Sequence, residues 1–158
     1  MTHKEPLNNL EALIAYFEKI AISFNRTEKD ETAISLSTRL GDRNGILHIR
    51  WESSEGYIRF IHVLPLQVPG KLREKMIILL NRINLVLPIL GFVLNEEDGI
   101  ITYCSQAFLD QNGSIPSYMI DAVIFQSIRT VNEILPQLQQ SVTRASGEDL
   151  SSLFKDHP

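Results

Sequence analysis

Three consecutive carboxylates are the side chains best suited to chemistry in this chain. Glu96, Glu97 and Asp98 stand together between two apolar stretches. A divalent cation or a paired acid and base would require such a group. No remote ligand is identifiable, however, and Asp98-Gly99 is typical of a tight hairpin turn because glycine readily adopts positive φ. We therefore interpret the three carboxylates as a solvated turn.

Histidine and cysteine offer a second kind of chemistry. His48 and His62 fall on segments that we expect to form neighbouring strands, but a zinc site would need two further nitrogen or sulfur ligands. Cys104 is the only thiol, and a nucleophilic cysteine also needs a positioned base. Its mid-strand position favours a packing role. We predict no catalytic residue, no metal, no cofactor and no enzymatic activity.

Asn81 and Asn84 lie one helical turn apart at the end of an apolar segment. Their amides could bind the backbone of a partner protein. They could instead cap the helix or tether its end to the neighbouring loop, and we favour this second interpretation.

The elements that carry these residues follow from the spacing of apolar side chains. Steps of three and four residues predict helices over 6–24, over 71–87 and from Pro116 to Pro136, which should kink or end the last one. Alternation predicts strands over 34–40, 46–53 and 57–64, and a hairpin over 91–109. The order α-βββ-α-ββ-α predicts an α+β domain with a five-stranded antiparallel sheet packed with helices.

Two of these elements are more apolar than one buried face requires. The strand 57–64 is apolar on both faces, and the helix 71–87 is nearly apolar all round. Such elements lie between two surfaces, one of which can belong to a second subunit, although ordinary core packing is the alternative. We predict a dimer or partner interface formed by Ile77, Leu80, Ile83 and Asn84.

Composition limits the remaining choices. With 158 residues, of which 44% are hydrophobic, we expect a single domain over 1–138 and a polar, flexible tail over 139–158. The net charge of −4 disfavours nucleic acid, which would need Arg39, Arg43, Arg50 and Arg59 to converge. Without a secretory signal or a long apolar stretch, we expect a cytoplasmic protein that binds no membrane.

Several of these features together resemble the YbjN family of bacterial sensory transduction regulator-like proteins, whose fold is similar to type III secretion chaperones. The resemblance is carried by the asparagine pair, the strand entry Gly91-Phe92, the acidic turn 95–99 and the final helix with Leu135-Pro136. It implies a homodimeric, non-enzymatic, chaperone-like or regulatory protein that binds a still unidentified protein partner. The rival interpretation is a small-molecule sensor or an enzyme with a cleft between the sheet and the third helix.

Overall fold

A computed structural model describes residues 5–27, 30–87 and 91–147. Its short and long strands are β1 (Pro6–Leu7), β2 (Asn25–Arg26), β3 (Ala33–Leu40), β4 (Arg43–Glu52), β5 (Tyr57–Gln67), β6 (Phe92–Leu94), β7 (Ile100–Phe108) and β8 (Ile115–Pro116). Its helices are α1 (Leu10–Lys19), the single 3₁₀ turn η1 (Gly70–Leu72), α2 (Arg73–Asn84) and α3 (Ser117–Gly147).

The sheet is antiparallel throughout and has the strand order β2-β3-β4-β5-β7-β6. The α+β class is therefore confirmed, and the five predicted strands are β3, β4, β5, β6 and β7. The sheet has a sixth strand, β2, and β1 pairs separately with β8. These additional strands are two residues long, which is too short for an alternating pattern to show in the sequence.

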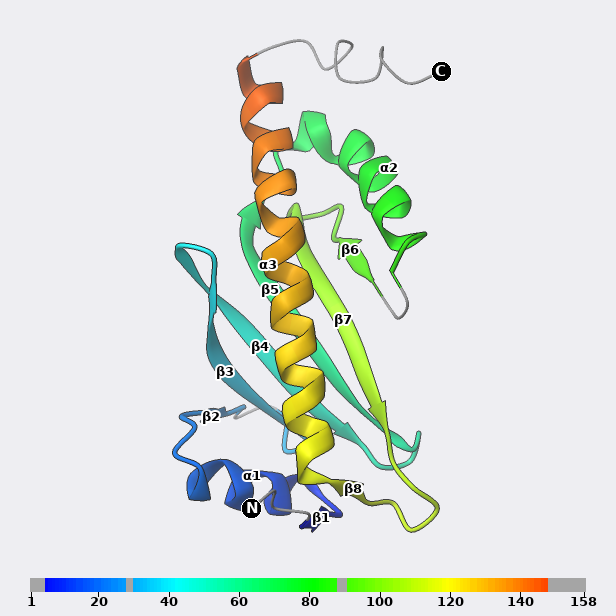
Figure 1. The fold of residues 1–158 in the computed structure, drawn as a ribbon. Helices are drawn as coiled ribbons and strands as arrows, with labels where there is room; N and C mark the ends of the chain where they lie inside the picture. The colour runs from blue at the N-terminus through cyan, green and yellow to red at the C-terminus, as the bar shows by residue number, and fades with distance from the viewer. Residues whose placement is uncertain (1–4, 28–29, 88–90, 148–158) are drawn as a thin grey trace.

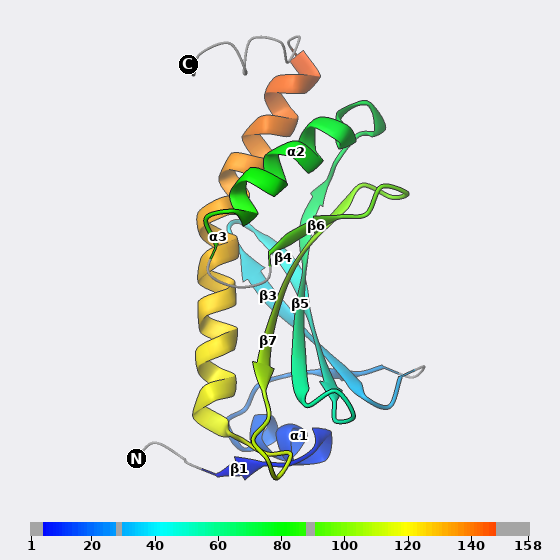
Figure 2. The same ribbon diagram turned by 90° about the vertical axis from the view of Figure 1, so that its right-hand side faces the viewer.

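The helices lie on one side of the sheet (Figure 1). α3 runs along this inner face, while α1 lies at one end and α2 at the other (Figures 1 and 2). The opposite, outer face is not covered by any element of the described ranges (Figure 2). The burial pattern follows this arrangement, since β5 alternates between fully buried residues such as Phe60 and half-buried ones such as Ile61.

The core under α3 consists of two apolar clusters. The cluster at the α1 end is built around Phe17, Ile49, Phe60 and Ile120. The cluster at the α2 end is built around Leu64, Met76, Leu80, Ile101 and Leu135. Both clusters use residues of β3, β5, β7 and α3, so these four elements join the two ends of the molecule.

The ends of the helices differ from the predicted ranges for local reasons. α1 is shorter than 6–24 because Asn9 caps it, accepting a hydrogen bond from the Ala12 backbone nitrogen at 2.8 Å. After its last residue, Ala21 adopts a φ of 59°, which the helix cannot continue. α2 likewise spans only Arg73–Asn84.

α3 does not end at Pro136, contrary to one of the two outcomes predicted for that residue. The helix continues to Gly147, and Pro136 is exposed, so the carbonyl oxygen of Asn132 that loses its helical partner faces the wet side. Residues 139–147 therefore belong to α3, whereas 148–158 lie outside the described residues. The boundary of the domain at residue 138 stays a prediction.

A tight turn joins β3 to β4. Leu40 pairs with Arg43, which leaves a two-residue turn in which Gly41 has a φ of 62°. Gly45 instead lies within β4, where a Cβ atom would overlap the Leu40 side chain. The Gly41 backbone nitrogen donates to Asn132 Oδ1 at 2.7 Å, which ties this turn to α3.

Candidate functional site

Asn84 fastens the end of α2 to the edge strand β6. Its Nδ2 donates to the Phe92 carbonyl oxygen at 2.8 Å, and the Phe92 backbone nitrogen donates to its Oδ1 at 2.7 Å. One carboxamide thus satisfies both backbone groups that Phe92 presents away from β7. A Cβ atom on Gly91 would overlap the Asn84 side chain, so glycine is required there. These contacts agree with the tether interpretation of Asn84.

Arg73, at the start of α2, fastens the acidic turn in a similar way. Its guanidinium donates to the carbonyl oxygens of Glu96, of Glu97 at 3.0 Å and of Val68 at 3.2 Å. Within the turn, Asp98 accepts from the Ile100 backbone nitrogen at 2.8 Å. The expected positive φ is present at Gly99, at 75°. Across the described residues, no group of His, Cys, Asp and Glu is arranged to hold a metal ion.

A groove of about 270 Å³ lies between α2 and β6. It is lined by Ile77, Leu80, Asn81, Asn84, Phe92, Val93, Leu94 and Glu96. Three of the four predicted interface residues, Ile77, Leu80 and Asn84, are thus brought together at this groove. The groove exposes similar amounts of polar and apolar surface, and it opens beside β6, whose Phe92 backbone is bonded to Asn84.

The fourth predicted residue, Ile83, is 9% exposed and Leu80 is 2% exposed, and both pack in the core of the same chain. The apolar side chains that α2 and its C-terminal end present to solvent are instead Ile78 at 49%, Leu85 at 85% and Val86 at 81%. Their apolar character is visible in the sequence. Helical periodicity alone did not show which stripe of a nearly all-apolar helix would face inward.

The outer face of the sheet carries a second apolar surface. Two neighbouring rows of side chains lie there, one across β4, β5, β7 and β6 and the other across β4, β5 and β7. The first row contains Ile46, Val63, Thr102 and Val93, and the second contains His48, Ile61 and Cys104. Ile46 is 47% exposed and Val93 is 56% exposed. The strand 57–64, predicted to be apolar on both faces, accounts for the centre of this surface.

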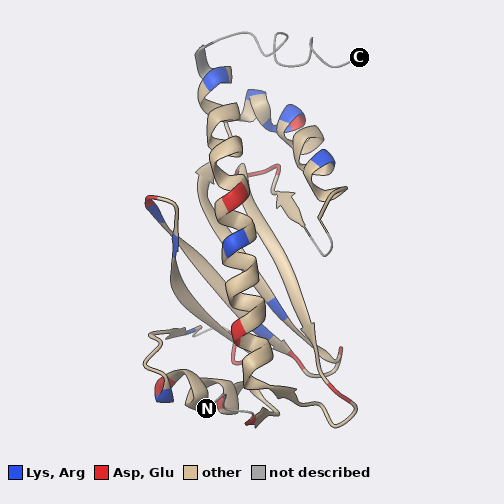
Figure 3. Cartoon of the chain, viewed as in Figure 1, with Lys and Arg blue, Asp and Glu red and all other residues tan. Residues whose placement is uncertain are grey.

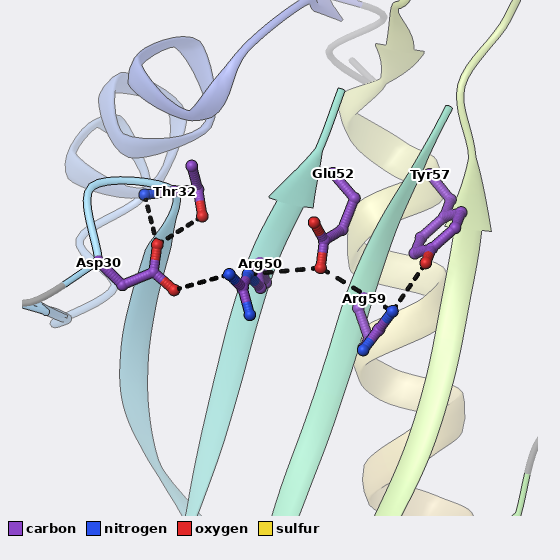
Figure 4. Close-up of polar contacts among 6 residues, drawn as sticks. All are labelled: Asp30, Thr32, Arg50, Glu52, Tyr57 and Arg59. Atoms are coloured by element: carbon purple, nitrogen blue, oxygen red, sulfur yellow. Dashed lines mark hydrogen bonds and ion pairs between the residues drawn. The ribbon is translucent and has the colours of Figure 1, made fainter. Parts of the chain in front are cut away.

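A chain of polar contacts borders the apolar rows at the end of the sheet near α1 (Figure 4). Arg50 pairs with Asp30 at 3.3 Å and with Glu52 at 3.3 Å. Arg59 lies 3.9 Å from Glu52 and donates to the Tyr57 hydroxyl at 2.7 Å. The two arginines are register partners on β4 and β5, so Glu52 offsets the repulsion between them.

Hydrogen bonds from Thr32 fix the position of the Asp30 carboxylate that pairs with Arg50. The hydroxyl and the backbone nitrogen of Thr32 both donate to Asp30 Oδ1, at 2.5 and 3.0 Å. These bonds to Thr32, together with the nearby Arg50 charge, lower the pKa of the Asp30 carboxyl from its usual value. These polar contacts therefore form a continuous row from the loop before β3, across β4, to β5.

The four arginines named for nucleic-acid binding do not form one patch. Arg39, Arg50 and Arg59 share the outer face, but Arg39 lies six residues along β3 from Ala33, the register partner of Arg50, or about 20 Å. Arg43 donates to the Pro65 carbonyl oxygen at 3.4 Å. Figure 3 shows basic residues spread over several elements of the described chain rather than gathered on one.

The histidines and the cysteine lie apart. His48 is on the outer face and His62 is buried on the inner face, so the two cannot share a metal ion. Cys104 lies on the outer face, where burial raises the pKa of its thiol. A raised pKa lowers the thiolate fraction, which is the opposite of an activated nucleophile.

A buried polar layer separates the two core clusters. His62, Ser105 and Ser127 lie between apolar residues of the two clusters on β5, β7 and α3. The Ser127 hydroxyl donates to the Ile124 carbonyl oxygen at 2.9 Å and therefore accepts from His62 Nε2 at 2.7 Å. Burial lowers the pKa of His62 to about 4, so this imidazole is neutral near pH 7.

A further hollow of about 400 Å³ lies beside α1, β2 and β3. Leu10, Ile14 and Ile34 form its apolar part. Across it, Arg26 forms a bidentate pair with Glu11, at 2.8 and 2.9 Å. Neither this hollow nor the α2–β6 groove lies between the sheet and α3, where the rival interpretation placed its cleft.

Comparison with known proteins bears on the family of the chain. Searching curated proteins gave no match. In the described part of the chain, no helix combines the length and the apolar character needed to span a membrane. The sequence model of the YbjN family, described as "Putative bacterial sensory transduction regulator", matches residues 9–140, which is more than half of the chain. The chain therefore belongs to the YbjN family.

Proposed function

We propose that this chain is a non-enzymatic regulatory or chaperone-like module that works as a homodimer and binds another protein. Membership of a family of sensory transduction regulators supports a regulatory role. The likeness to type III secretion chaperones, the cytoplasmic location and the absence of catalysis are parts of the proposal. So is the expectation that neither nucleic acid nor a membrane is a partner.

One observation carries the protein-binding part of this proposal. At its C-terminal end, α2 exposes Leu85 and Val86 almost completely, and α2 also carries half-exposed Ile78 and lines the groove along β6. Large apolar side chains grouped on a surface mark a site for another protein. Because Asn84 and Arg73 hold α2 against β6 and the acidic turn, this surface is preorganised, which lowers the entropy cost of binding.

The test compares the wild type with Leu85→Lys as baits in extracts of the source organism, with Ile20→Lys as a matched control. Ile20 is also an exposed aliphatic residue, but it lies at the end of α1. A protein retained by the wild type and by Ile20→Lys but lost from Leu85→Lys would then be purified and its affinity measured by calorimetry. We expect Leu85→Lys to weaken that binding at least tenfold. Equal binding by all three baits would contradict the proposal.

The second candidate is a small-molecule sensor, and the 400 Å³ hollow beside α1 favours it. An apolar floor with a bidentate ion pair at its rim has the composition of a ligand site. Thermal unfolding in the presence of small carboxylic acids and amines would test it. A stabilisation that disappears in Arg26→Ala would support the sensor, and no stabilisation by any compound would count against it.

A further inference from the structure

We propose that the outer face of the sheet is the surface through which two copies of this chain pack against each other. The proposal rests on the homodimer in the proposed function and assigns its interface to Ile46, Ile61, Val63, Val93 and Thr102, rather than to α2. The two sheets would pack as aligned layers, with the apolar rows of one copy on those of the other.

The distribution of residue types on this face has the anatomy of an interface. The two apolar rows lie in the middle of the sheet, and polar residues lie beyond them toward both ends of the strands. Arg39 and Asn44 flank them at the β3–β4 turn, and the chain of Arg50, Glu52 and Arg59 flanks them at the other end. A dry centre with a polar rim is what specific protein interfaces show.

The size of the face also fits a second copy. Together with one polar row on either side of them, the apolar rows span β3, β4, β5 and β7, and with strands about 4.8 Å apart and alternate residues about 7 Å apart this face covers roughly 500 Å² in projection. Accessible surface exceeds projected area because side chains are not flat. A standard interface buries about 800 Å² per partner, so this face is large enough for a stable dimer.

The charge of the outer face favours a second copy of the chain over a strongly acidic or strongly basic partner. The whole chain carries a net charge of −4, so two copies repel each other unless the contacting faces have few unbalanced charges. On this face, Arg50 and Arg59 are balanced by Asp30 and Glu52, and Arg39 adds one positive charge at the opposite end. A rim with so small an excess of charge repels its own copy weakly and does not select a strongly acidic or basic partner.

Pairing of two copies through the sheet edges is less favourable. β2 is two residues long and β6 is three, and Asn84 already occupies the outward backbone groups of Phe92. Short and blocked edges are how proteins prevent the addition of another strand. These features argue against pairing through β2 or β6, whereas face-to-face packing of the sheets uses the exposed side chains of the outer face.

Two matched substitutions separate this interface from α2. Ile46→Lys lies on the outer face and Ile78→Lys on α2, and the two isoleucines are 47% and 49% exposed. Each substitution adds the same charge at a similarly exposed position. Light scattering over a range of concentrations gives the mass of each protein, and circular dichroism with thermal unfolding verifies that each is folded.

We expect the wild type and Ile78→Lys to have twice the 18.0 kDa mass of the chain, and Ile46→Lys to have the mass of one chain. A wild-type dimer that dissociates with Ile78→Lys but not with Ile46→Lys would overturn this inference and leave the homodimer intact. So would a dimer that survives both. A wild-type monomer at all concentrations would overturn the homodimer itself.

A milder variant keeps the test valid if Ile46→Lys does not fold. Ile46→Thr retains the β-branched shape that suits a strand and removes part of the apolar contact. We expect its dimer to dissociate at a concentration at least tenfold higher than that of the wild type. An unchanged dissociation concentration would contradict the outer-face interface.

Discussion

The two faces of one sheet differ in how they are used. Both are lined with β-branched and apolar side chains in the middle of the sheet. On the inner face, residues such as Ile49 and Phe60 are fully buried by helices of the same chain. On the outer face, Ile46 and Val93 remain about half exposed. The comparison shows that an apolar strand face does not by itself belong to the core of its own chain.

β5 shows most clearly what the sequence contains about this difference. Its period of two predicts both faces, and the lack of a polar face predicts a central strand. The structure places β5 in the interior of the sheet, between β4 and β7. The inner face is covered because α3 runs along it, and the part of α3 beyond Pro136 adds Leu138 and Ala145 to the cluster at the α2 end.

The largest expected effect is a difference in the free energy of unfolding between substitutions on the two faces. Phe60→Ala removes a fully buried side chain and should lower the free energy of unfolding by about 3–5 kcal/mol. Ile46→Ala, at a half-exposed position on the other face, should cost less than about 1 kcal/mol in the monomer. Urea denaturation at low protein concentration measures both, and equal losses would remove the distinction between the faces.

The buried polar layer on the inner face gives a pH dependence of intermediate size. His62 has a pKa of about 4 in the folded chain, below the value of about 6.5 expected when it is unfolded. The unfolded chain therefore binds a proton that the folded chain does not, so stability falls as the pH drops from about 6.5 to about 4. This loss amounts to about 3 kcal/mol.

The His62→Leu variant is the control for this effect, because leucine has no proton to bind. The denaturation midpoint of the wild type should fall relative to that of the variant as the pH falls from 7 to 4.5. A constant difference between the two proteins over this range would show that His62 does not titrate on unfolding.

A smaller effect is expected where α2 meets the edge of the sheet. Asn84→Ala leaves the backbone nitrogen and the carbonyl oxygen of Phe92 without their partner, which should cost about 1–3 kcal/mol. The exposed Asn81→Ala, one turn earlier, should change the free energy of unfolding by less than about 0.5 kcal/mol. Similar losses for the two asparagines, measured by urea denaturation, would contradict the tether.

The smallest expected effect concerns the polar rim of the outer face. Glu52→Gln weakens two ion pairs that are partly exposed, so the monomer should lose less than about 1 kcal/mol. The same change leaves Arg59 without its carboxylate partner beside Arg50, which keeps only Asp30, so it should weaken the dimer more than the monomer. Sedimentation measures the dimer, and an unaltered dissociation constant would exclude Glu52 from the rim.

The sequence predicted the long elements well because each has a sustained period. It did not predict where α1 begins, since that depends on the cap formed by Asn9, or that α3 continues beyond Pro136. The tether role of Asn84 was predicted from its position at a helix end. Its two bonds to Phe92 and the need for glycine at position 91 depend on the path of the chain between α2 and β6.

The outer face could not be located from the sequence for a different reason. A surplus of apolar residues was evident on two elements, but all four of the predicted interface residues lie on α2. Which stripe of α2 faces inward, and which face of β5 is covered, are both decided by packing between elements distant in the chain. The residues Ile46 and Val93 join one surface only because β6 and β4 lie in the same sheet.

The reactivity of Cys104 tests most directly whether the outer face is covered in the working protein. It is the only cysteine of the chain and lies in the middle of that face. We predict that a maleimide reagent modifies it several-fold more slowly at concentrations where the protein is a dimer than at dilutions where it is a monomer, and that Ile46→Lys abolishes the difference. An equal rate in dimer and monomer would contradict the account.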